Sequence, residues 1–151
     1  MVKIHIDLPN HRRTKGEFLW ALPLGGDRYQ VKNVPFFAYG LNFEDTVEAI
    51  APEPGTKPEI RRISEWGGHR TIRVSFEEQT PKERRGPLLE RLNAHKAYFE
   101  NADGTLYAID VEPEGDYDAV RKQLDDWLRE GILDYETCEA RAPGSFDAEP
   151  G

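Results

Sequence analysis

A helix followed at once by a strand is the clearest feature of this chain. Apolar residues recur at helical spacing along one face of that helix and stop at a glycine. They are Val120, Leu124, Trp127 and Leu128, followed by Gly131. Asp116 can cap the start of the helix, Gly131 can end it with a positive φ, and residues 132–138 read as a strand. Because such a helix needs its apolar face covered, the segment must pack against a sheet.

The segments before this helix supply the sheet. Residues 71–76 alternate apolar and polar side chains, as a half-buried strand does. Pro87 can occupy the first turn of a short helix that reaches about His95. Residues 97–100 and 105–111 then form a hairpin around 101–104, where an Asp-Gly pair suits a tight turn. The order β-α-β-β-α-β predicts a ferredoxin-like lobe, with both helices on one face of an antiparallel sheet.

This topology predicts one shared core. Both apolar helix stripes must then point at the same face of the strands, so Leu92 and Leu124 cannot lie on opposite sides of the sheet. The expected core consists of Ile72, Val74, Phe76, Leu88, Leu92, Leu106, Ile109, Val120, Leu124, Trp127, Leu128 and Tyr135.

The first half of the chain has no sustained helical period. Five short strand candidates, at residues 3–8, 17–22, 28–32, 46–51 and 59–64, are separated by Gly, Pro and Asn signals. This spacing favours a small SH3-like barrel. The fold class is therefore α+β, with a β-rich lobe at 1–66, a ferredoxin-like lobe at 67–139 and a disordered acidic tail at 140–151. Residues 66–69 are a flexible joint or a sharp corner between strands.

Charge is divided unequally along the chain. Residues 99–151 carry 15 acidic against 4 basic side chains, a net charge of −11, whereas residues 1–98 carry 13 against 16. An acidic face of this size repels nucleic acid and anionic membranes and attracts cationic partners at long range. We therefore expect a basic protein as the partner, with neither nucleic acid nor membrane.

The acidic side chains concentrate at the strand-to-helix loop and along the helix that follows. In a purely structural interpretation these side chains solvate the surface and complement the helix dipole. In a functional interpretation they form a docking surface for a basic protein. The candidate partner-binding residues are Asp110, Glu112, Glu114, Asp116, Asp118, Asp125, Asp126 and Glu130. If they dock a partner, most of them must face water.

A second candidate site is a ligand-binding cleft between the lobes, formed by Phe37, Tyr39, His69 and Arg70. His69 could act as a base and Arg70 as an anion clamp beside two glycines, and the aromatic side chains could anchor a ligand. The same aromatic side chains could instead plug the end of a small barrel, and His69 could simply begin a strand.

Other chemistry finds no support in the sequence. The four histidines lack metal-ligand spacing, and neither glycine pair matches a phosphate-binding loop, so we expect no metal and no cofactor. Cys138 reads as a buried structural thiol. The first residues alternate and contain no apolar run for a signal peptide or membrane helix, so we expect a cytoplasmic protein.

Three stretches resemble a known bacterial family. They are Asn33-Val-Pro-Phe-Phe-Ala-Tyr-Gly40, Glu44-Asp-Thr-Val-Glu-Ala49 and Gly68-His-Arg-Thr-Ile-Arg-Val74. They are similar to the N-x-P-F-F-A-x-G, G-D-V-V-E-A and G-H-x-T-x-R-V patterns of the family called domain of unknown function 4265. Glu44 stands where that pattern has a glycine, so a tight turn there must form without it. The resemblance covers roughly residues 17–139.

These observations favour a binding protein over an enzyme. Members of the family look similar to small accessory proteins, some from gene neighbourhoods that resemble toxin and immunity loci. Small acidic proteins suit the capture of basic enzymes. We expect a non-catalytic protein-binding domain, most concretely an immunity-type protein that inhibits a cognate bacterial toxin. The alternative is a small-molecule-binding or regulatory accessory domain.

Overall fold

The computed structural model describes residues 1–150, which form two compact units. The first unit contains Met1–His69 and the segment from Cys138 onward, and the second is Arg70–Thr137. The boundary lies three residues after the predicted one at residue 66. The segment from residue 140, predicted as a separate tail, belongs to the first unit.

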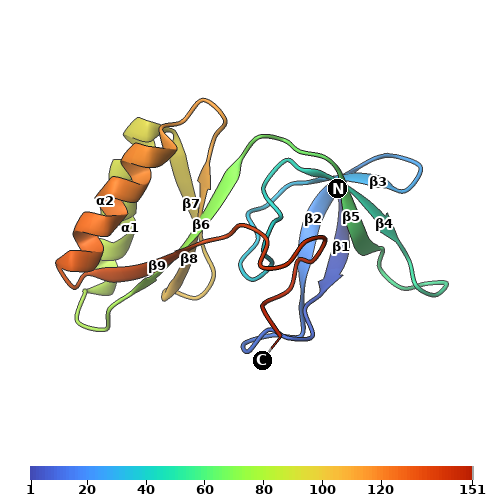
Figure 1. The fold of residues 1–151 in the computed structure, drawn as a ribbon, viewed down its shortest axis with the longest axis horizontal. Coiled ribbons are helices and arrows are strands. Elements are labelled where there is room, and N and C mark those ends of the chain that lie inside the picture. Colours follow the sequence, from blue (N-terminus) through green and yellow to red (C-terminus); the bar gives the residue numbers. More distant parts are fainter. Residues whose placement is uncertain (151) are drawn as a thin grey trace. The chain divides into compact units, whose positions relative to one another are not determined.

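Five strands close into a barrel in the first unit (Figure 1). They are β1 (Val2–Asp7), β2 (Gly16–Gly25), β3 (Arg28–Val31), β4 (Thr46–Ile50) and β5 (Glu59–Glu65), close to the predicted segments. Neighbours pair antiparallel from β1 through β5, and β1 closes the barrel by pairing parallel with β5 at His5 and Glu59. Alternation along each strand buries one set of side chains inside the barrel. That core comprises Ile4, Ile6, Leu8, Leu19, Ala21, Val31, Ala38, Leu41, Val47, Ala49 and Ile60.

The segment after Cys138 folds back onto this barrel. The Tyr39 N–H donates to the Phe146 carbonyl at 2.9 Å, and the Asn10 N–H donates to Asp147 Oδ2 at 2.7 Å. The Phe146 side chain packs against the barrel core, and Asp147 is buried. Residues 140–150 of the predicted disordered tail thus form an ordered segment, and residue 151 lies outside the described residues. Its Pro, Gly and Ala content concealed one aromatic anchor and one buried carboxylate.

The loop between β3 and β4 ends in a tight corner at residues 42–45, which contain no glycine. Glu44 has a φ of 70°, the left-handed conformation that favours glycine, at the position where the resemblance expects one. The backbone of Gly67 packs directly on this corner. A Cβ atom at Gly67 would lie 2.5 Å from the Glu44 carbonyl oxygen, so only glycine fits there. The predicted joint at residues 66–69 is therefore a close contact between two backbones at this point.

The second unit is a four-stranded sheet with helices on one face (Figure 1). Its elements are β6 (Arg70–Phe76), α1 (Lys82–Glu90), the 3-10 helix η1 (Arg91–His95), β7 (Ala97–Asn101), β8 (Leu106–Val111), α2 (Tyr117–Arg129) and β9 (Leu133–Thr137). The sheet order is β7-β8-β6-β9, with every neighbouring pair antiparallel. The predicted element order β-α-β-β-α-β is the one observed.

The helices and strands of this unit share one core. Leu92 and Leu124 belong to the same buried cluster, as the topology requires, and Trp127 is 3% exposed. Leu128 was predicted to be in this core, which is wrong, because its side chain is 43% exposed. At about 100° per residue, Leu128 lies roughly 80° around the helix from Val120, at the margin of the buried stripe. Leu106 is buried but lies outside this cluster.

The first helix begins earlier than the sequence indicated. It starts at Lys82, and Pro87 lies inside it instead of in its first turn. Arg85 anchors the helix, because its buried guanidinium donates to the carbonyls of Thr80, Gly104 and Glu77. The charged run that opens this helix carried no apolar period, so its start was missed. Within the described part of the chain, no helix has the length and apolar content needed to cross a membrane.

Candidate docking surface

Strand β2 carries a row of large apolar side chains on its outer face. Inward-facing Leu19 and Ala21 are fully buried, and the alternate residues point out of the barrel. Those outward residues are Phe18, Trp20 and Leu22, and exposed Leu24 follows at an irregularity in the β2–β3 pairing; the four side chains are 54%, 45%, 40% and 41% exposed. We call these four residues the β2 row. Single exposed apolar residues are ordinary, but a contiguous row of four marks an interaction surface.

The strands on either side place polar groups beside the β2 row. Lys3 is opposite Trp20 in β1, with its Nζ 5.0 Å from the centre of the Trp20 ring. His5 is opposite Phe18, and their ring centres are 4.6 Å apart. Gln30 of β3 is opposite Leu22. An apolar centre with a polar and cationic margin is the usual anatomy of a protein–protein interface.

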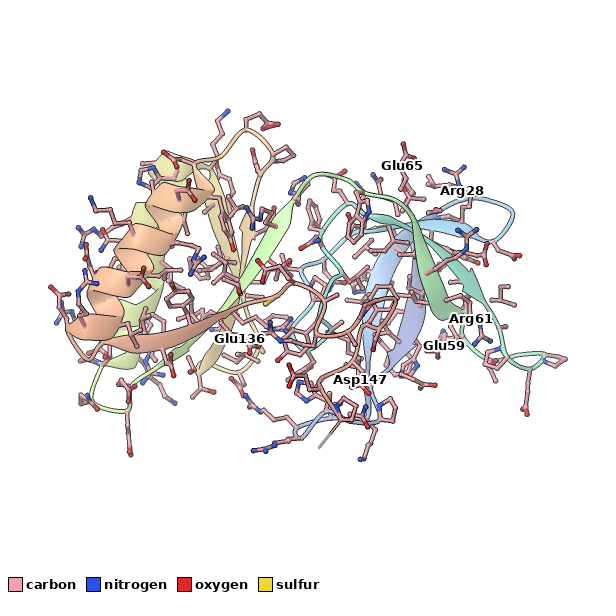
Figure 2. The ribbon with its side chains drawn as sticks, viewed as in Figure 1. Arg28, Glu59, Arg61, Glu65, Glu136 and Asp147 are labelled. Carbon is pink, nitrogen blue, oxygen red and sulfur yellow. The ribbon has the colours of Figure 1, made fainter. Side chains whose placement is uncertain are left out.

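Ion pairs tie down other side chains of the barrel surface. Arg28 pairs with Glu65 at 3.8 Å, and both project from the barrel wall (Figure 2). Lys32 pairs with Glu44 at 3.6 Å. These exposed pairs contribute little stability, but they hold charged groups at the margin of the wall.

The acidic residues predicted to bind a partner divide into two groups. Four of them are buried in the second unit or bind other residues of it. Asp110 is buried in β8, contrary to the expectation that it faces water, because every residue of that strand is buried. Asp116 caps α2 through the Ala119 N–H, Asp125 accepts from the Tyr135 hydroxyl, and Asp126 pairs with Arg129. Glu112, Glu114, Asp118 and Glu130 lie at the surface of the loop and helix, with Glu112 half-buried.

Tyr135 and Arg121 form part of the same α2–β9 contact. Burial, followed by the hydrogen bond to Asp125, raises the pKa of the Tyr135 hydroxyl. A hydrogen bond with Tyr135 raises the pKa of the Arg121 guanidinium. Basic side chains thus interrupt the acidic surface along α2, so its uniform negative face is confined to the loop and the first turn.

The aromatic candidates around residues 36–39 belong to the barrel. Glu17 holds this loop, because its carboxylate accepts hydrogen bonds from the N–H groups of Phe36, Phe37 and Ala38 at 2.8–3.0 Å. Phe37 packs against the barrel core and Tyr39 is 8% exposed. The loop therefore plugs the barrel, which was the structural alternative. The role of Glu17 was missed, since nothing in the sequence connects it to a loop 20 residues away.

His69 and Arg70 are adjacent in sequence and each contacts an aromatic ring. The His69 ring is 5.2 Å from that of Phe43 and interacts electrostatically with buried Asp45. Arg70 belongs to the other unit, where its guanidinium is 3.4 Å from the centre of the Tyr117 ring. Of the four residues predicted to bind a ligand, Phe37, Tyr39 and His69 therefore belong to the first unit and Arg70 belongs to the second.

Asp45 is the buried carboxylate of the corner beside His69. Desolvation raises its pKa, and the hydrogen bonds that it accepts from the N–H groups of Gly67 and Asn42, each 2.8 Å long, act in the opposite direction. The first bond joins the corner at residues 42–45 to the Gly67 backbone, and the second lies within the corner. Asp45 thus stabilises the backbone at this corner, which the sequence pattern did not indicate.

A hollow of ≈ 240 Å³ also lies in the first unit. It is lined by Gly40, Arg62, Ile63, Trp66, Ala140, Gly144, Ser145 and Phe146. Pockets for drug-sized ligands usually span about 300–1,000 Å³, so this one suits only a small ligand. Trp66 is 65% exposed there, and Arg62 pairs with Glu48.

Comparison with known proteins places the chain in a family. The model of the family described as Domain of unknown function (DUF4265) matches residues 17–135. The chain belongs to the DUF4265 family. The region matched to DUF4265 contains the β2 row and almost all of the second unit.

One solved structure has a similar fold. It is described as a novel crystal structure of a hypothetical protein from Neisseria gonorrhoeae, with a TM-score of 0.75 and 15% identity over 92% of this chain and 96% of that chain. This likeness supports the fold of the DUF4265 chain alone. A search of curated proteins found no match.

Proposed function

We propose that this chain is a non-catalytic protein-binding domain that uses the β2 row as its docking surface. The observation that carries this proposal is the exposure of all four large apolar side chains of the β2 row. Removing Trp20 and Phe18 from water would stabilise a complex, since fully buried aromatic anchors dominate interface energetics. The surrounding polar groups, Lys3 among them, suit the margin of such an interface.

In its specific form, the proposal is an immunity-type protein that inhibits a cognate bacterial toxin. The net charge of −8 supports a basic partner, because long-range attraction accelerates its association. Glu112, Glu114 and Asp118 contribute to that field. The β2 row would supply the apolar contact after encounter.

Two fold assignments accompany the functional one. We assign the first unit to the SH3-like barrels, on the basis of its five closed strands, and the second to the ferredoxin-like folds. Support for the second assignment is the all-antiparallel order β7-β8-β6-β9, in which each helix connects two strands that are separated by a third.

A small-molecule-binding role is the second candidate, and the hollow beside Trp66 favours it. Trp66 could stack on a planar ligand while Arg62 contacts an anionic group. Binding of a small ligand there would leave the β2 row unused, so the two roles are separable by mutation.

Photo-crosslinking tests which surface meets a partner. A benzophenone amino acid is placed at position 20, and at position 50 as a control, because Ile50 is 41% exposed on the same barrel. We expect position 20 alone to give a covalent adduct in cells. The adduct supports the proposal only if the purified captured protein then binds the wild-type chain. Adducts of equal yield at both positions, or a captured protein with no affinity, contradict it.

Growth tests the specific form. Expressed alone, the captured protein should inhibit growth, and co-expression of this chain should restore it. Absence of toxicity would exclude the immunity role and leave the broader binding proposal to the affinity measurement.

A further inference from the structure

One histidine and two carboxylate side chains meet where the barrel closes. His5 and Asp7 are two residues apart on the outer face of β1. Glu59, which is labelled in Figure 2, is the first residue of β5. The parallel pairing of β1 with β5 brings His5 and Glu59 together across 54 residues. One nitrogen and two carboxylate oxygens therefore meet, all within 4.8 Å of one another.

The separations suit a first-row divalent metal ion. His5 Nδ1 is 3.5 Å from Asp7 Oδ1 and 2.7 Å from Glu59 Oε1. Zinc bonds to nitrogen and oxygen are about 2.0–2.2 Å long, so two ligands of a tetrahedral ion lie roughly 3.4 Å apart. The first separation already has this value. The second must lengthen by roughly 0.7 Å, which exchange of the shared proton for a metal ion would allow.

Neighbouring groups hold two of the three donors in place. The Asp7 N–H donates to Glu59 Oε2 at 2.7 Å, which orients that carboxylate. The His5 ring lies over Gly16, where a Cβ atom would be 2.6 Å from Nε2, and against the Phe18 ring. Glu59 is buried, whereas the Asp7 side chain is 73% exposed. The group is thus ordered on its inner side and open to solvent at Asp7, where water could complete a coordination shell.

A proton could replace the metal ion between His5 and Glu59. A hydrogen bond from His5 to Glu59 accounts for the 2.7 Å contact, but it does not require Asp7, whose 3.5 Å separation from Nδ1 is long for a hydrogen bond. A metal ion, in contrast, needs the third donor. Asp7 therefore distinguishes the two interpretations.

We propose that His5, Asp7 and Glu59 form a binding site for a divalent transition-metal ion of the zinc class, with solvent in the remaining coordination position. One imidazole and two carboxylates suit such ions. This site is independent of the proposed partner, because its ligands are the barrel's own residues. Bound metal would join the two strands at which the barrel closes, and would therefore raise the stability of the first unit.

Zinc titration tests the site. The full chain is freed of metal with a chelator that is then removed, and zinc chloride is added in calorimetry and in thermal unfolding. We expect one bound ion per chain and a higher Tm. Asp7→Asn should weaken binding at least about tenfold while it retains the His5–Glu59 contact. Asp27→Asn, an exposed aspartate in the β2–β3 turn of the same barrel, is the matched control and should bind as wild type does.

The nitrogen signal of His5 supplies a second readout. Zinc should shift its Nδ1 resonance in the wild-type chain and in Asp27→Asn, and should leave it unshifted at the same zinc concentration in Asp7→Asn. Wild-type affinity or a wild-type Nδ1 shift in Asp7→Asn would overturn the proposal. No measurable zinc binding by the wild-type chain would overturn it as well.

Discussion

Lys3 and Trp20 face each other across the β1–β2 pair, with the ammonium nitrogen 5.0 Å from the centre of the indole ring. The contact holds a 45% exposed tryptophan against the barrel wall, in the middle of the β2 row. A large side chain that is already ordered loses little further conformational freedom when a partner covers it. The β2 row is therefore prepared to bind without rearrangement of the barrel.

The core of the second unit depends on Trp127. Trp127→Ala should lower the free energy of unfolding by ~3–5 kcal/mol, because the ring is 3% exposed and its removal leaves a cavity. Leu128→Ala, at the next position but 43% exposed, should change it by less than about 1 kcal/mol. Denaturant unfolding measures both. Equal losses would mean that α2 packs on the sheet with a different face.

The left-handed Glu44 provides a second test of the fold. Glu44→Gly should stabilise the barrel by up to about 1 kcal/mol, because the relief of the left-handed conformation exceeds the loss of a weak Lys32 pair and of a hydrogen bond from Gln30. Glu44→Ala should destabilise it, since it keeps the positive φ and loses the pair. Thermal unfolding of the two variants checks the opposite signs, and a loss of stability in Glu44→Gly would contradict this explanation.

Asp45 should make stability depend on pH. Burial raises its pKa, so the protonated form is favoured in the folded chain, and this contribution is fully present below the unfolded value of about 3.9. It is lost as pH rises through the raised pKa. Asp45→Asn removes this dependence, although it also changes the hydrogen bond to Gly67 by an amount independent of pH. The free energy of unfolding of Asp45→Asn minus that of wild type should therefore increase as the pH rises from about 4 to the raised pKa of Asp45.

Denaturant unfolding of both chains at several pH values across that interval measures whether this difference increases. A constant difference would mean that burial leaves the affinity of Asp45 for protons unchanged.

The acidic residues between β8 and the first turn of α2 should accelerate association with a basic partner. Reversing charge in Glu114→Lys/Asp118→Lys should slow association with a basic partner about tenfold at low salt and leave dissociation nearly unchanged. The difference should vanish near 1 M salt, where the screening length is about 3 Å. Stopped-flow association at several ionic strengths is the measurement. Rates that match those of wild type at every salt concentration would show that these carboxylates only solvate the helix.

Local patterns predicted most of the fold, and long-range contacts account for what they missed. Period-2 and period-3.6 apolar spacing located the strands and α2, because burial of one face dictates those periods. The long-range contacts of Glu17, Asp45 and Glu59 were not recognised, because each carboxylate binds groups at least 19 residues away, apart from the Asp45–Asn42 bond. Phe146 was missed because one aromatic side chain in a Gly- and Pro-rich segment has no period.

The β2 row was not predicted as a surface, because its exposure also depends on long-range structure. The β2 strand was predicted, but outward Phe18 and Trp20 break the alternation of apolar and polar residues, since both faces of the strand are apolar. A strand that is apolar on both faces usually lies inside a sheet stack. Here one face lines the barrel and the other is exposed, which only the closed barrel reveals.

The dissociation constant for the captured partner tests the central claim most directly. Wild-type chain, Trp20→Ser and Ile50→Ser are titrated against the same purified partner by calorimetry, after circular dichroism has shown that all three are folded. We predict that Trp20→Ser weakens binding at least about tenfold, as loss of an aromatic anchor does, and that Ile50→Ser binds like the wild type. Unchanged affinity in Trp20→Ser, or an equal loss in Ile50→Ser, would contradict the assignment of the β2 row as the docking surface.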